Sequence, residues 1–93
     1  MTDGLQTHPH LDSGREQNTR ALDVAVGILV GLRRCSTYVS FRELLSASER
    51  HAVPIFALAG ALVNLASRDP NCRPATAAAQ SAAEREWGAY YPP

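Results

Sequence analysis

Residues Val24 to Ser36 read VAVGILVGLRRCS: nine uncharged residues that include two glycines, then two arginines and a Cys-Ser pair. A membrane-spanning helix needs roughly 20 apolar residues, so this run has about half the necessary length. It also lacks the strict alternation of a half-buried strand. We therefore interpret the stretch as the central helix of a small bundle, covered by other helices around much of its circumference.

The residues around this stretch follow the helix period. Apolar residues recur at spacings of three and four, namely at Leu22, Ala25, Val26, Leu29 and Leu32. Gly27 and Gly31 share a face and cost about 1 kcal/mol each relative to alanine, so they predict a close approach by another backbone or by a ligand. Arg33 and Arg34 lie in the last turn, where cations favour the helix dipole, and the sequence leaves open whether they also bind a ligand.

A second helix is predicted to begin after an N-cap at Ser36 or Thr37. Its expected buried stripe consists of Phe41, Leu44, Leu45 and Ser48. The polar residues between these positions fall on the opposite side of the helix from the apolar ones. We therefore expect this helix to lie on the surface of the bundle.

A third helix is predicted to open at Pro54, which has no amide hydrogen to lose at the first helical position. Its expected buried stripe consists of Ile55, Leu58, Ala59, Leu62 and Ala66. Phe56, Gly60 and Val63 form a second apolar strip on the opposite side. This strip either contacts a partner or is buried under the C-terminal segment, and the sequence does not choose between the two.

The two ends of the chain have a different composition. We predict a disordered N-terminal arm over 1–14, a three-helix domain over 15–68 and a C-terminal extension over 69–93. The extension is expected to be helical over about 74–87, opened by Pro74 and stopped by Gly88. Its apolar edge is narrow, so we expect it to dock weakly, with Trp87 as the anchor.

All nine basic residues are arginines, and nine acidic residues balance them, so the whole chain has no net charge. The segment from Ser13 to Arg68 holds seven arginines and four acidic residues, which makes the middle mildly basic at +3. The N-terminus does not resemble a signal peptide, and the two cysteines lack metal or redox spacing. We predict a cytoplasmic protein with reduced thiols and no membrane association.

The sequence contains none of the motifs that carry catalysis. It has no glycine-rich phosphate loop, no HExxH and no GxSxG pattern. His8 and His10 are too few to fix a metal. We therefore expect a protein that is not an enzyme, with no catalytic residues, no cofactor and no metal site.

The segment from Arg20 to Val63 resembles, without a gap, the ANTAR domain of bacterial transcription antitermination regulators. The residues that match the family pattern are Arg20, Leu22, Ala25, Gly27, Ile28, Leu29, Cys35, Ser36, Phe41, Leu44, Ala47, Ser48, Ile55, Leu58 and Ala59. The resemblance implies an all-α fold: a three-helix ANTAR-like bundle, here with a fourth C-terminal helix. It also implies binding to paired stem-loops in a transcript leader, which prevents a terminator hairpin from forming.

From this resemblance and the basic middle segment we predict RNA contacts by Arg20, Gly27, Arg33 and Arg34. The family has basic or charged residues where this chain has Val26, Pro54 and Phe56. An alternative is therefore an ANTAR-derived protein-interaction or dimerisation module that does not bind RNA. In that case Val26, Phe56 and Val63 would form the contact with a second copy or with a regulatory protein.

Overall fold

The computed structural model of the chain describes residues 9–67 and 75–91, with the backbone alone over 9–17. This part of the chain consists of four α-helices and one short 3-10 helix, without a strand. The elements in chain order are α2 (Pro9–Arg33), α3 (Thr37–His51), α4 (Ile55–Ser67), α5 (Ala77–Trp87) and η1 (Gly88–Tyr90). The predicted all-α class is therefore confirmed.

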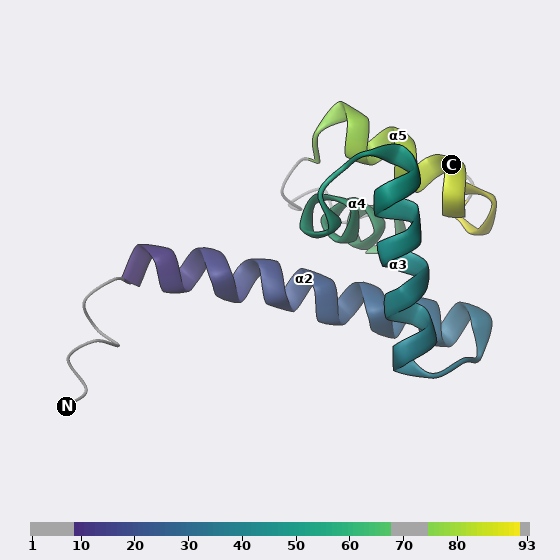
Figure 1. Cartoon of the computed structure of the whole chain (residues 1–93), viewed down its shortest axis with the longest axis horizontal. Helices are drawn as coiled ribbons and strands as arrows, with labels where there is room; N and C mark the ends of the chain where they lie inside the picture. Colours follow the sequence, from purple (N-terminus) through teal and green to yellow (C-terminus); the bar gives the residue numbers. More distant parts are fainter. Residues whose placement is uncertain (1–8, 68–74, 92–93) are drawn as a thin grey trace.

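The helices form a bundle at the C-terminal half of α2 (Figure 1). α2 packs chiefly against α4, and α4 in turn packs against α5. α3 crosses at a steep angle: the axis turns by 108° between Asn18–Arg33 and Thr37–His51. The N-terminal half of α2 projects beyond the bundle, so only part of this long helix contributes to the core.

The core takes one or more large side chains from every helix. Leu29 of α2, Leu44 of α3, Leu58 and Leu62 of α4 and Trp87 of α5 are fully buried. Alanines fill the space between them, at Ala25, Ala47, Ala59, Ala61, Ala79, Ala82 and Ala83. The small residues let the four helices approach one another closely around few large side chains.

Local capping residues set the turns between the helices. Ser36 is the N-cap of α3, because its Oγ accepts a hydrogen bond from the Val39 amide at 3.1 Å. This confirms the first of the two predicted caps. Arg34 and Ala52 follow α2 and α3 in the left-handed conformation, each with φ of 54°. Both helices therefore end in a conformation that normally favours glycine.

Two predicted boundaries are wrong. α2 begins at Pro9 rather than at Arg15, so residues 9–14 of the expected disordered arm are helical. α5 begins at Ala77, where the Thr76 Oγ1 accepts a hydrogen bond from the Ala79 amide at 3.1 Å, rather than at Pro74. A hydroxyl cap fits this start better than proline because it satisfies an otherwise unpaired amide. The rest of the arm, 1–8, and the start of the predicted extension, 69–74, lie outside the described residues.

The buried stripe of α3 is rotated by about one residue from the prediction. Ser40, Leu44 and Ala47 are buried, whereas Phe41 is 37% exposed. Ser40 tolerates burial because its Oγ lies 3.2 Å from the Cys35 Sγ in a hydrogen bond. The sequence prediction preferred the aromatic residue for the core, but the small side chain faces inward where the helices cross closely.

α5 is an integral part of the core rather than a weakly docked extension. Trp87 is the largest fully buried side chain of the described chain, and Ala79 and Ala83 are buried with it. The prediction of Trp87 as the anchor is confirmed. Among the described residues no single helix is long and apolar enough to cross a membrane; only the bent pair formed by α2 and α3 has the length and composition.

Candidate nucleic-acid interface

Three of the four predicted RNA contacts lie on one exposed face of α2. Arg20, Gly27 and Arg34 are seven residues apart, which brings them to nearly the same side of an α-helix. All three are exposed. Arg34 lies just past the helix: its amide still donates to the Val30 carbonyl at 2.7 Å, while its own φ of 54° ends the right-handed turn. We call Arg20, Gly27 and Arg34 the α2 line.

Gly27 and Gly31 of α2 are not sites of close contact between helices. A Cβ atom added to Gly27 or Gly31 would meet nothing within 4 Å. The prediction that another backbone of this chain approaches them is therefore wrong. The same openness leaves the α2 line accessible to a molecule from outside.

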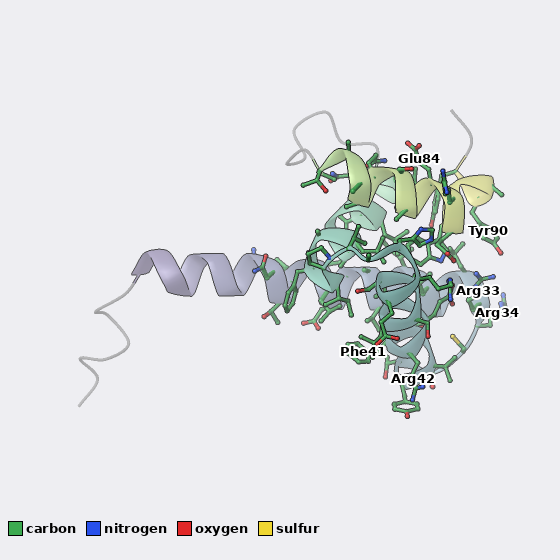
Figure 2. The ribbon with its side chains drawn as sticks, turned by 45° about the horizontal axis from the view of Figure 1, so that its top comes forward. Arg33, Arg34, Phe41, Arg42, Glu84 and Tyr90 are labelled. Atoms are coloured by element: carbon green, nitrogen blue, oxygen red, sulfur yellow. The ribbon has the colours of Figure 1, made fainter. Side chains whose placement is uncertain are left out.

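Arg33 is occupied by contacts within the chain, unlike its neighbour. Its Nε donates to the Glu43 Oε1 at 3.2 Å and its Nη2 to the Glu43 Oε2 at 2.8 Å, a two-point pairing of guanidinium and carboxylate. Its Nη1 donates to the Tyr90 hydroxyl at 2.8 Å, and the guanidinium carbon lies 5.4 Å from the centre of the Tyr90 ring. Figure 2 shows Arg33 and Tyr90 on the same side of the bundle. Arg33 thus joins α2 to α3 and to η1.

Glu43 is the centre of this cluster. It also accepts a hydrogen bond from the indole Nε1 of Trp87 at 2.8 Å, which satisfies the only polar atom of that buried side chain. Burial, the largest influence, raises the pKa of Glu43, but the hydrogen bonds from Arg33 and Trp87 and the charge of Arg33 outweigh it and hold the pKa below its usual value. The pKa of Arg33 is raised, chiefly by its hydrogen bond to Glu43.

Glu86 makes a second connection between α3 and α5. Its Oε1 pairs with Arg50 and its Oε2 with His51, each at 2.8 Å. Burial is again the largest influence and raises the pKa of Glu86, yet the hydrogen bonds and charges of Arg50 and His51 hold it below its usual value. We call the contacts of Glu43 and Glu86 with their partners the α3–α5 seam.

The first turns of α3 carry an aromatic pair that the sequence prediction did not identify as a site. Arg42 donates to the Tyr38 hydroxyl at 3.2 Å, and its guanidinium carbon lies 6.0 Å from the centre of the Tyr38 ring. Because Phe41 was predicted to lie in the core, the joint exposure of Tyr38 and Phe41 was not expected from the sequence. The spacing of three and four residues between Tyr38, Phe41 and Arg42 was the signal that could have found them.

The predicted protein interface is split by the fold. Phe56 is 42% exposed, whereas Val26 and Val63 are half-buried and pack against the core. Of the two readings of the outer strip of the third helix, burial applies to Val63 and exposure to Phe56. The three residues therefore do not offer equal access to a partner.

The described residues hold no group of three or more His, Cys, Asp or Glu side chains that could bind a metal ion. The chain matches no family model, no curated protein and no solved structure.

Proposed function

We propose that the chain is an RNA-binding regulator of transcription antitermination that resembles ANTAR proteins and binds hairpins in transcript leaders. The observation that supports this most is the α2 line, in which two exposed arginines flank an open glycine. The order of the helices from Arg20 to Val63 is also the order that the resemblance implies.

The α2 line places two arginines along the helix where they can contact phosphates of one RNA. Arg20 and Arg34 are fourteen residues apart, or about 21 Å along a helix. Between them Gly27 carries no side chain, so a sugar-phosphate backbone can reach the helix surface. Each arginine that neutralises a phosphate releases a condensed counterion, which makes the interaction strongly dependent on salt.

Arg33 has a different role in this proposal from the other predicted contacts. Its guanidinium is paired with Glu43 and Tyr90, so RNA would have to displace these partners before it could use the same donors. We assign Arg33 to holding the corner between α2 and α3, which places Arg34 at the surface. Binding of the α2 line to the leader hairpin would stabilise that hairpin, so that the terminator hairpin does not form and RNA polymerase continues.

Binding of a two-hairpin leader RNA tests the proposal. We expect a mobility shift that weakens as salt rises, and we expect Arg20→Ala and Arg34→Ala each to lower the slope of log affinity against log salt by about 1. Arg85→Ala is the matched control, because Arg85 is an exposed arginine on α5, away from α2. Absent or salt-insensitive binding across a library of leader RNAs would contradict the proposal.

The exposed Phe56 supports a second candidate, a protein-interaction or dimerisation module without RNA binding. Its ring stands near the start of α4, where the family pattern has a charged residue. If this candidate is correct, Phe56→Ala abolishes a homodimer or the capture of a regulatory protein in sedimentation experiments. A wild-type chain that sediments as a monomer and binds leader RNA would exclude it.

A further inference from the structure

The N-terminal part of α3 exposes an unusual concentration of large apolar side chains. Tyr38 is 66% exposed, Val39 50% and Phe41 37%. Half of the large apolar side chains that are exposed in the described residues thus lie within four consecutive positions. Tyr38 and Phe41 are three residues apart and are therefore neighbours on one face of the helix.

Arg42 completes this face. It lies one turn after Tyr38, and its contacts with that ring and hydroxyl hold the two side chains together at the surface. Figure 2 shows Phe41 and Arg42 at the same end of α3. The exposed rings and the guanidinium together make a cationic surface rather than a purely apolar one.

The charge around this face selects the kind of partner. No acidic residue occurs between Asp23 and Glu43, and Glu43 is itself paired with Arg33. Arg34 and Arg42 have no ion pair among the residues whose side chains the structure describes. An anionic partner with planar groups complements both the charge and the rings.

We propose that Tyr38, Phe41 and Arg42 form a stacking site for unpaired bases of an RNA loop. This inference rests on the proposed RNA-binding function and names the part of the RNA that α3 recognises. Every nucleobase has a face that can stack on an aromatic ring or on a guanidinium, and bases in loops are free to turn outward. The α2 line then contacts the phosphates of the stem, and Arg34 leads directly through Cys35 and Ser36 to the loop-binding face of α3.

The experiment compares a hairpin with a loop of unpaired adenines, one of which is replaced by a fluorescent adenine analogue, with a blunt duplex of the same stem. We expect wild-type protein to quench the analogue and to bind the hairpin more tightly than the duplex. Tyr38→Ala should weaken hairpin binding by about five- to 150-fold and remove the quenching, while duplex binding stays unchanged.

Two matched variants separate the ring from other effects. Tyr38→Phe keeps the ring and loses only the hydroxyl, so it should bind the hairpin and quench like the wild type. Val39→Ala removes an exposed apolar side chain of the same turn and should also leave binding unchanged. Because Tyr38 and Val39 are exposed, we expect all three variants to fold, which a thermal melt verifies.

The outcomes distinguish this inference from the function on which it rests. Equal, salt-dependent binding of hairpin and duplex, unaffected by Tyr38→Ala, would overturn the stacking site and leave RNA binding intact. Binding of neither RNA by the wild type would overturn both proposals. Loss of self-association on Tyr38→Ala, with hairpin binding unchanged, would show that this face contacts protein instead.

Discussion

The α3–α5 seam and the α2 line use the same residue type in opposite ways. In the seam, Arg50 pairs with Glu86, and Arg33 pairs with Glu43, which also accepts a hydrogen bond from the buried Trp87. In the α2 line, Arg20 and Arg34 stand at the surface without an acidic partner among the described side chains. The adjacent pair Arg33 and Arg34 shows the difference most clearly: both are exposed, but only Arg33 has a carboxylate partner among the described side chains. The guanidinium of Arg34 therefore lacks the carboxylate contacts that engage those of Arg33 and Arg50.

The largest test of this contrast is Trp87→Ala. It removes the largest buried side chain and one donor to Glu43, so we expect the free energy of unfolding to fall by about 3–5 kcal/mol. Urea denaturation measures the change, with Arg85→Ala as a control at an exposed side chain of the same helix. A loss below about 1 kcal/mol would show that α5 is not part of the cooperative core.

Substitution of Glu43 should have the next largest effect. Glu43→Ala removes the carboxylate partner of Arg33 and leaves the buried indole N–H of Trp87 without its acceptor, so we expect a loss of about 1–3 kcal/mol in the free energy of unfolding. Glu49→Ala is the matched control, because Glu49 is an exposed glutamate on the same helix. If both variants unfold at the same urea concentration, the contacts of Glu43 contribute nothing to stability.

Acid should lower the free energy of unfolding that the α3–α5 seam contributes. The pKa values of Glu43 and Glu86 are lowered in the fold, so their stabilisation is complete above the ordinary glutamate pKa in the unfolded chain. It is lost as the pH falls through the lower folded-state values. Unfolding measured from neutral pH downward should show this decline, and the combined Glu43→Gln and Glu86→Gln variant should show a shallower one. An equal slope for both proteins would contradict the assignment.

The smallest expected effects are those of glycine substitutions at the two residues in the left-handed conformation. Arg34→Gly and Ala52→Gly each relieve a residue with φ of 54°, so we expect each to stabilise the fold by about 1 kcal/mol. Only Arg34→Gly should weaken binding of a leader RNA, because Ala52 lies at the far end of α3. Equal RNA affinities of the two variants would show that Arg34 does not contact the RNA.

Much of the bundle could be predicted from local patterns. The Ser36 cap and the buried residues Leu29, Leu44 and Leu58 follow from hydroxyl capping and from the helix period, which involve only neighbours in the chain. The start of α2 was missed, because residues 9–14 contain proline and glycine and show no apolar period.

The candidate site was predictable only in part. The positions of Arg20, Gly27 and Arg34 on one face follow from their spacing alone. The capture of Arg33 by Glu43 and Tyr90 does not, because these partners are ten and 57 positions away along the chain. Phe41 was placed in the core because hydrophobicity alone cannot tell which side of a helix faces a close crossing.

The sequence by itself determined that this chain forms helices, where α3 is capped and which apolar residues can form a core, because helix period and capping are local properties. Only the tertiary structure decided that α5 completes the core, that Ser40 replaces Phe41 inside it and that Arg33 pairs with Glu43 while the adjacent Arg34 does not. These outcomes depend on the 108° turn between α2 and α3 and on the packing of Trp87 against Glu43. Both bring together residues that are distant in the chain, and no local pattern encodes such an encounter.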